Sequence, residues 1–315
     1  MAWSTCKKFP RAWPKNCSTL GRAVVNCPAF RTLNSLTPTT MRLLTPGIRA
    51  KFFALATTIF AFALMGLSLP SHAAQAFRVG TDPSYPPMEF KDKTGAIIGF
   101  DVDMNKEIAK RLGAPLKLTE INFEGIWQAL NAKHYDAAVS SCSITQKRMQ
   151  NFLFSKPYIA NEQVIISKQA LAQKLNKLED LKGLTVAVQT GTTAEFGAQK
   201  LLKEKPGLFT LKSYMEATRA LDDLGLGRVQ AVVVDSVVGL YYVGLNKGKD
   251  FAYASASLPP EPIGLAFRKD DTALKAQVDK ILDDMRADGT LQAISKKWFG
   301  ADLVSHVKEE YPVGE

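Results

Sequence analysis

Short strand-like runs alternate with amphipathic, helix-like segments from residue 77 almost to the end of the chain. In the first such helix, Met104, Ile108 and Leu112 recur on one face, while Asp101 is placed to cap its start and Gly113 to end it. Regular alternation of strands and helices predicts an α/β fold. The predicted strands cover residues 77–81, 97–100, 116–121, 137–140, 164–167, 184–189, 210–214 and 231–235. The predicted helices follow Asp101 and cover residues 124–131, 193–202, 217–224, 274–285 and 291–299.

These elements fall into two groups, which predicts two lobes. The stretch that follows the 164–167 strand is rich in Lys and Gln, and residues 258–262 are rich in proline. These two stretches are the candidate crossings between the lobes. We therefore expect a first lobe over residues 77–164, a second lobe over residues 165–258, and a return to the first lobe over residues 259–315.

The chain before residue 77 has the pattern of an export signal. Residues 52–69 are uncharged and mostly apolar, follow several basic residues, and lead to a run of small residues. This order is typical of a secretory signal peptide, here with cleavage after Ala73 or Ala76. A membrane anchor is the alternative, because about 18 apolar residues approach the ~20 that span a bilayer.

The true start of the chain is predicted to be Met41, which directly precedes the basic part of the signal. Residues 1–40 show neither helical nor alternating apolar periodicity. We therefore interpret residues 1–40 as a non-native extension and residues 41–76 as the signal peptide.

Charge is distributed unevenly along the chain. The formal net charge of +10 would by itself favour an anionic partner such as nucleic acid. The residues before position 77 hold nine Lys and Arg and no acidic residue, which leaves 31 basic against 30 acidic residues in the remainder. The predicted folded part is close to neutral, so we expect no nucleic-acid partner.

Cysteine use fits an exported protein without disulfides. Cys142 is the single cysteine after the predicted signal peptide, so no intramolecular disulfide is expected even in an oxidising compartment. Its serine neighbours on a predicted buried strand favour a small core residue. No cysteine lies beside the predicted cleavage sites, which argues against a lipid anchor. We expect a monomeric protein in a periplasm.

Catalytic and metal-binding motifs are absent from the sequence. It contains no metal-ligand spacing, glycine-rich phosphate loop or nucleophile elbow. His72, His134 and His306 have no Cys or Asp partner at ligand spacing. We therefore expect no cofactor, no metal and no enzymatic activity.

Polar and aromatic residues follow the ends of several predicted strands. Open α/β sheets bind their ligands at this edge. The predicted ligand-binding residues are Asp82, Tyr85, Phe123, Ser140, Ser141, Ser143, Arg148, Gln189, Thr193 and Asp235.

Five motifs occur in order between residues 77 and 299. They are Gly80-Thr-Asp-Pro-Ser-Tyr-Pro-Pro-Met-Glu-Phe90, Gly99-Phe-Asp-Val-Asp103, Ser143-Ile-Thr-Gln-Lys-Arg148, Gln189-Thr-Gly-Thr-Thr193 and Met285-Arg-Ala-Asp-Gly-Thr290. This set resembles the polar amino-acid-binding periplasmic proteins of ABC transporters (solute-binding protein family 3), especially the histidine, lysine/arginine/ornithine and glutamine binders. The resemblance implies a two-lobed, type II periplasmic-binding-protein fold whose two-segment hinge closes around a free L-amino acid. It also implies docking on the membrane permease subunits of an importer.

The resemblance assigns the two ends of the amino-acid backbone to different lobes. Arg148 would hold the α-carboxylate, which a planar guanidinium can bind through two parallel hydrogen bonds. Backbone N–H groups near Ser143 and Thr193 would complete this anion site, the latter at a helix N-terminus. Asp235 would pair with the α-ammonium. Taken singly, Arg148 could instead be a solvated surface residue and Asp235 a helix cap.

The remaining predicted residues limit which ligand side chain fits the site. By the same resemblance, Tyr85 and Phe123 would enclose it and Asp82 would face its far end, although isolated aromatic residues more often serve packing. An anionic side chain is disfavoured, because Asp82 is negative and Gln189 stands where the glutamine binder has a lysine. Lysine, arginine, ornithine or histidine fits through charge pairing and cation–π contact. Glutamine stays open, because a carboxylate also accepts from an amide.

Two other functions are compatible with a two-lobed architecture. Periplasmic dehydratases that act on prephenate or arogenate share it, and Glu261 would be the candidate general acid here, without a supporting motif. A sensor domain of a signalling receptor would need a membrane span or output domain after the lobes, and the sequence to Glu315 has neither. The expectation is therefore a transport receptor.

Overall fold

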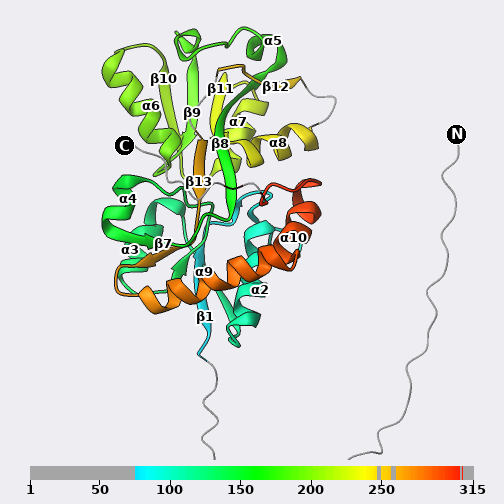
Figure 1. Ribbon diagram of the computed structural model, residues 1–315. Coiled ribbons are helices and arrows are strands. Elements are labelled where there is room, and N and C mark those ends of the chain that lie inside the picture. The colour runs from blue at the N-terminus through cyan, green and yellow to red at the C-terminus, as the bar shows by residue number, and fades with distance from the viewer. Residues whose placement is uncertain (1–74, 247–249, 257–259, 306, 308–315) are drawn as a thin grey trace, which may run out of the picture. The chain divides into compact units, whose positions relative to one another are not determined.

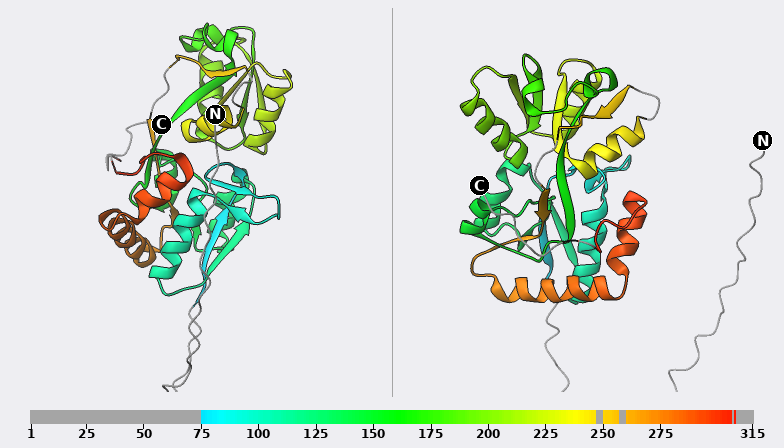
Figure 2. Two further views of the ribbon diagram at one scale, coloured as in Figure 1. Left: turned by 90° about the vertical axis from the view of Figure 1, so that its right-hand side faces the viewer. Right: turned by 45° about the horizontal axis from the view of Figure 1, so that its top comes forward.

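The computed structural model describes residues 75–246, 250–256, 260–305 and 307. They form a mixed α/β structure of two lobes, each with its own mixed sheet, as the views in Figures 1 and 2 show. Within these residues no helix has the length and apolar character needed to cross a membrane. The predicted signal peptide and N-terminal extension lie outside the described residues, apart from positions 75 and 76.

Lobe 1 is built on a five-stranded sheet in the order β5-β1-β6-β14-β7. The central strand β1 (Phe77–Thr81) runs parallel to β5 (Leu116–Glu120) and β6 (Ala137–Ala138). Strand β14 (Ala266–Arg268) runs antiparallel to β6 and to β7 (Phe152–Phe154). The carboxyl ends of β1 and β6 therefore lie at the same edge of the sheet.

Several helices and a small antiparallel sheet complete lobe 1. The small sheet has the order β2-β3-β4, and α2, α9 and α10 pack against one another. The elements are β2 (Ser84–Tyr85), β3 (Glu89–Lys91), β4 (Ile97–Ile98), α2 (Phe100–Arg111), η3 (Phe123–Gly125), α3 (Ile126–Asn131), α4 (Gln146–Asn151), α9 (Thr272–Ala287) and α10 (Thr290–Phe299).

Lobe 2 is built on a sheet in the order β10-β9-β11-β8-β12. Strands β9 (Thr185–Gln189), β10 (Thr210–Tyr214) and β11 (Ala231–Asp235) are parallel, whereas β8 (Ile159–Lys168) and β12 (Phe251–Tyr253) are antiparallel to their neighbours. Its helices are α5 (Gln169–Ala172), η4 (Leu178–Leu181), α6 (Thr193–Glu204), α7 (Ala217–Gly225) and α8 (Ser236–Leu245).

Two paired strands join the lobes. Strand β13 (Pro260–Ile263) pairs antiparallel with the first half of β8, whose second half belongs to the sheet of lobe 2. Lobe 1 holds β13 through a bond from Ile144 N to the Pro262 carbonyl of 2.8 Å. Figure 2 shows β8, in green, running from one lobe into the other. The predicted boundary at residues 164 and 165 falls within β8, and that at 258 and 259 lies outside the described residues, so both remain predictions.

The core of lobe 1 explains its helix positions. Met104 and Ile108 of α2 are fully buried, as are Leu282 and Met285 of α9, so the predicted apolar faces of both helices turn inward. Burying such side chains is the main favourable term in folding, at roughly 1.5–3 kcal/mol each. Cys142 is also fully buried, and burial raises the pKa of its thiol to about 12, which suits the predicted small core residue.

The start of α2 differs from the sequence prediction. Gly99, with φ of 142°, is the N-cap residue, and the helix begins at Phe100 rather than after a capping Asp101. The strand expected over 97–100 is therefore only Ile97–Ile98. Asp101 is buried and accepts hydrogen bonds from interior groups instead of capping the helix. A cap prediction from local sequence is wrong here because a tertiary contact takes the carboxylate.

Candidate functional site

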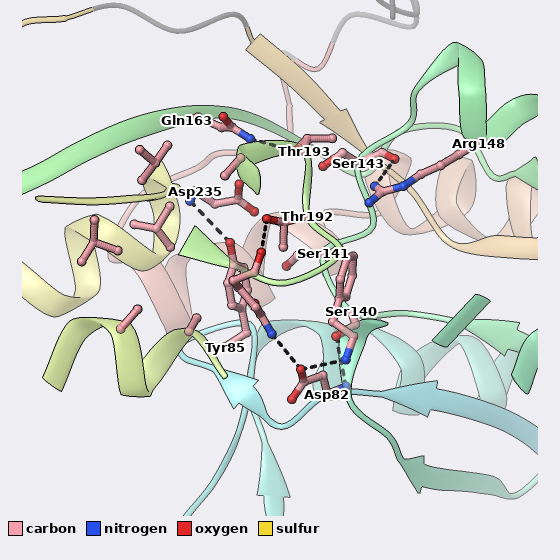
Figure 3. Close-up of a pocket in the computed structure, with 18 residues that line it drawn as sticks. Asp82, Tyr85, Ser140, Ser141, Ser143, Arg148, Gln163, Thr192, Thr193 and Asp235 are labelled. Carbon is pink, nitrogen blue, oxygen red and sulfur yellow. Dashed lines mark hydrogen bonds between the residues drawn. The ribbon is translucent and has the colours of Figure 1, made fainter. Parts of the chain in front are cut away.

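A pocket between the lobes brings together all ten residues that the sequence predicts for ligand binding (Figure 3). They come from strand β2, from the ends of strands and the loops that follow them, and from the first turns of η3, α4 and α6. The lining also includes Gln163, Thr192, Ala194, Ala217, Ala220, Val232, Val233 and Val234. The shared location is a finding, whereas the binding role of each residue is still a prediction.

Asp82 follows β1 and lies at one side of the pocket. Its carboxylate Oδ2 accepts from Phe123 N at 3.0 Å and from Gln189 Nε2 at 2.9 Å. Its own backbone N–H donates to Ser140 Oγ at 3.0 Å. Burial raises the pKa of Asp82, and the hydrogen bonds that its carboxylate accepts oppose that rise. Asp82 is thus a buried carboxylate that contacts both lobes.

Arg148, on α4, is buried in the pocket wall and is not a solvated surface arginine. Its Nη1 donates to the Ser143 carbonyl at 2.9 Å, and its Nη2 donates to the Gly191 carbonyl at 3.2 Å. The guanidinium carbon also lies 4.6 Å from the ring centre of Trp127 and 5.5 Å from that of Phe123. Carbonyl acceptors and aromatic faces together fix the direction of the guanidinium.

The N-terminus of α6 forms the lobe 2 wall of the pocket. Thr192 caps the helix by accepting from Glu195 N at 3.3 Å, and Glu195 accepts from Gly191 N at 2.8 Å. Glu195 therefore binds the N–H of the residue before the N-cap, and the two hydrogen bonds together hold the first turn in place. The first N–H groups of a helix favour an anion, so this wall suits a carboxylate.

Asp235 ends β11 and stands at the N-cap position of α8, but its side chain forms no capping hydrogen bond. The alternative of a helix cap thus holds for the position of Asp235 but not for its carboxylate. Its backbone N–H donates to the hydroxyl of Tyr85 at 3.4 Å, which connects the lobes. Burial and, to a smaller extent, the negative charge of Glu261 raise the pKa of Asp235 to about 7, although the side chains of Tyr85 and Asn161 oppose the rise. Figure 3 shows Asp235 and Arg148 on the side of the pocket away from Asp82.

Both predicted aromatic residues line the pocket. Tyr85 is 8% exposed and Phe123 is 6% exposed, so each is largely covered by protein. Burial raises the pKa of the Tyr85 hydroxyl well above 10, and the negative charge of Asp235 adds to this rise, so the group stays neutral. Phe123 also packs at right angles against Trp127, with ring centres 6.0 Å apart. The aromatic residues therefore serve both packing and the pocket lining.

Sequence reasoning missed two polar lining residues, Gln163 and Thr192. Thr192 had a usable signal, because a threonine followed three residues later by Glu195 is a capping-box pattern. Gln163 had none, because it reaches the pocket through the pairing of β8 with β11, where it stands opposite Asp235.

Glu261, the nominated general acid, is not among the residues that line this pocket. It lies on β13, and its Oε2 accepts from Thr193 Oγ1 at 2.7 Å. The same hydroxyl oxygen accepts from Gln163 Nε2 at 2.7 Å. Within the described part of the chain, no group of three or more His, Cys, Asp or Glu side chains could hold a metal ion.

Comparison with known proteins gives consistent matches over the two lobes. Residues 77–301 match the family described as bacterial extracellular solute-binding proteins, family 3. The histidine-binding periplasmic protein of Escherichia coli (strain K12) is 35% identical over 237 residues, which cover 73% of this chain and 89% of that protein. The lysine/arginine/ornithine-binding periplasmic protein of the same strain is 35% identical over 247 residues, which cover 75% and 94%. A solved structure of an ancestral arginine-binding protein bound to arginine has a TM-score of 0.68 at 37% identity, covering 73% of this chain and 100% of that one.

Proposed function

Because the chain belongs to the bacterial extracellular solute-binding proteins of family 3, we propose that it captures a basic amino acid for an ABC importer. The ligand would be arginine, lysine, ornithine or histidine, with glutamine as the alternative. Relatives named for histidine, lysine, arginine and ornithine support this class. Two of them are named periplasmic, which agrees with the predicted signal peptide and with a periplasmic location. The permease subunits of the importer would be its protein partner, and the receptor itself a monomer.

The observation that carries the proposal is the charge pattern of the pocket. A buried guanidinium, Arg148, and a buried carboxylate, Asp235, lie in one pocket on different lobes. An α-amino acid presents a carboxylate and an ammonium at fixed separation, and these two groups are its natural partners. The N-terminus of α6 would add a second favourable group for the carboxylate.

The second carboxylate, Asp82, supports a cationic side chain. Both Asp82 and Asp235 are buried. The α-ammonium can pair with only one of them, so an amino acid with a neutral or anionic side chain would leave the other carboxylate without a cationic partner. Tyr85 and Phe123 line the same pocket and offer aromatic faces to a cation. An amide would also donate to Asp82, which keeps glutamine as the alternative.

Closure of the lobes would couple binding to recognition by the importer. Arg148 belongs to lobe 1 and Asp235 to lobe 2, so one ligand can pair fully with both groups only when the lobes are together. A ligand that makes more contacts in the closed state shifts the population toward that state. Strands β8 and β13 are the segments that would bend, because they are the ones that join the sheets.

The chain is a binding protein rather than an enzyme, as are the three relatives named above. Glu261 also lacks the position that dehydratase chemistry needs. A general acid must reach the proton that it transfers. The Glu261 carboxylate is engaged by the hydroxyl of Thr193, outside the lining of the pocket.

A thermal-shift panel tests the proposal. The protein without its leader is freed of carried-over ligand by dialysis under mild denaturant, then mixed with each of the common amino acids, ornithine and citrulline. Any compound that binds only the native state raises Tm. A rise confined to basic amino acids, or to these and glutamine, is expected. No rise with any amino acid would contradict the proposal, and prephenate turnover would then be assayed.

A further inference from the structure

Two acidic residues from different sequence motifs, Glu89 and Asp101, meet beside the pocket without lining it. Glu89 ends the Pro-Pro-Met-Glu run on β3, and Asp101 lies in the Gly-Phe-Asp run at the start of α2. The backbones are joined by a 2.9 Å bond from Asp101 N to the Met88 carbonyl. Gly99 allows this approach, since a Cβ there would lie 2.1 Å from the Met88 carbonyl oxygen. The approach buries both carboxyl groups, with Glu89 0% and Asp101 1% exposed.

Each carboxyl group holds one pocket residue. Glu89 Oε1 accepts from Ser140 Oγ at 2.7 Å, and that hydroxyl oxygen in turn accepts from Asp82 N at 3.0 Å. Asp101 Oδ2 accepts from Ser141 N at 3.1 Å and from the Tyr158 hydroxyl at 2.9 Å. Ser141 has a φ of 47°, in the left-handed region that side chains rarely adopt, so its bond to Asp101 supports a strained pocket segment.

The second oxygen of each carboxyl group indicates that the two groups share a proton. Glu89 Oε2 and Asp101 Oδ1 are buried, and no N–H or hydroxyl of the described residues donates to them. The two carboxyl groups nevertheless interact, since each affects the pKa of the other. Two ionised carboxylates in such contact, away from water, would repel strongly, whereas one proton between them satisfies both oxygens.

The surrounding charges give no other way to neutralise the pair. Neither carboxyl group forms an ion pair with a basic side chain in the described part of the chain. The titratable groups that face Glu89 are Asp101, Asp82, Tyr85 and Tyr158, which are all acidic. Burial, followed by the charge of Asp101, raises the pKa of Glu89 well above its usual value.

We propose that Glu89 keeps a proton at neutral pH, donates it to Asp101, and thereby positions Ser140 and the Asp82 backbone at the edge of the ligand pocket. The proton belongs to Glu89 because Asp101 accepts bonds from both an N–H and a hydroxyl, which favour its ionised form, whereas Glu89 accepts only one. Glu89 is a positioning residue that does not line the pocket. The protonation is independent of any ligand, while the positioning effect rests on the proposed function.

Infrared difference spectroscopy of the ligand-free protein tests the protonation. The carbonyl stretch of a protonated carboxylic acid is distinct from the bands of an ionised carboxylate. At pH 7.5, the wild type minus Glu89→Gln spectrum is expected to contain this stretch, with the isotope shift of an exchangeable proton in heavy water. A spectrum without that band would show that Glu89 is ionised and would overturn the proposal. Failure of the protein to bind any amino acid would not affect this readout.

Ligand titration tests the positioning. Glu89→Ala removes the acceptor of Ser140 and the donor to Asp101, so its affinity for the amino acid found in the panel is expected to fall by at least about tenfold. Glu89→Gln should restore most of that loss, because its carbonyl accepts from Ser140 and its NH₂ donates to Asp101. Equal affinity of Glu89→Ala and wild type, or no rescue by Glu89→Gln, would overturn the positioning role. If Glu89→Ala does not fold, Glu89→Gln against Glu89→Met gives the same comparison.

Discussion

The side-chain amide of Gln189, in lobe 2, donates a hydrogen bond of 2.9 Å to the carboxylate of Asp82, in lobe 1. The same Nε2 donates to the Met215 carbonyl at 3.1 Å, so both of its hydrogens are directed to acceptors. The side-chain group of Gln189 that is left to bind a ligand is its carbonyl oxygen, an acceptor. This end of the pocket therefore presents acceptors, and acceptors select a ligand side chain that donates.

Asp82→Asn tests this selection. Replacing the carboxylate with an amide removes the charge partner of a basic side chain in a buried site, so affinity for arginine or lysine should fall by at least about thirtyfold. Affinity for glutamine should change much less, because an amide also pairs with an amide. Calorimetric titration of both ligands measures the difference. Asp284→Asn, at an exposed position on α9, is the matched control. Parallel losses for arginine and glutamine would argue against a role for Asp82 in selectivity.

Arg148→Ala is expected to weaken binding of every amino acid ligand well over tenfold. The ligand carboxylate would be buried without its guanidinium partner, and such truncations cost about 2–5 kcal/mol. Arg148→Lys should recover little of the lost affinity, since an ammonium cannot form the two parallel hydrogen bonds of a planar guanidinium. Arg228→Ala, whose side chain is 65% exposed, controls for the loss of a positive charge. Unchanged affinity in Arg148→Ala would remove this residue from the site.

The raised pKa of Asp235 predicts how ligand affinity depends on pH. Its pKa in the free protein is raised to about 7, so below that pH the carboxyl group holds a proton. An α-ammonium favours the carboxylate, so binding must release this proton below pH 7. Affinity should therefore decrease as pH falls below about 7, by up to roughly tenfold per pH unit.

Titration with arginine from about pH 5 to 8 measures this dependence, because the side chain of arginine does not titrate in that range. Asp235→Asn should bind more weakly at pH 8 and lose most of the slope, which separates Asp235 from other groups that titrate nearby. A wild-type affinity that is constant across the range would contradict the pairing of Asp235 with the ammonium.

Gly80→Ala should destabilise the protein without any change to a pocket side chain. A Cβ at this position would lie 2.2 Å from the ring of Tyr135, which is fully buried. Overpacking of this kind costs about 1–3 kcal/mol. Urea denaturation measures the free energy of unfolding. Gly197→Ala, on an exposed face of α6 with no atom within 4 Å of the new Cβ, is the control and should gain up to about 1 kcal/mol.

Much of the fold could be predicted because its signals are local. The bounds of β1, β10 and β11 match the sequence prediction, since each is a short β-rich run between clear turns. Helix α8 was missed because its sequence is apolar on nearly every side, so no amphipathic pattern marks it. The capping role expected of Asp101 was wrong because Ser141 and Tyr158, distant in sequence, bind its carboxylate.

The site residues also differ in whether a local sequence pattern reveals them. Asp82 follows β1 and Asp235 ends β11, so strand prediction alone placed both near the edge of the sheets where ligands bind. Gln163 and Glu89 depend on which segments pack together, and no local pattern in the sequence reveals that pairing. The binding roles rest on resemblance and on chemistry, and the variants above test them.

The central claim is that one pocket holds both ends of an amino acid. The most direct measurement compares, by calorimetric titration, the amino acid found in the panel with its decarboxylated amine and with its D-enantiomer. The account predicts tight binding of the L-amino acid, and a loss of at least about a hundredfold for the amine, because Arg148 and the α6 N-terminus then have no carboxylate to bind. Equal affinity for the amino acid and its amine would contradict the account.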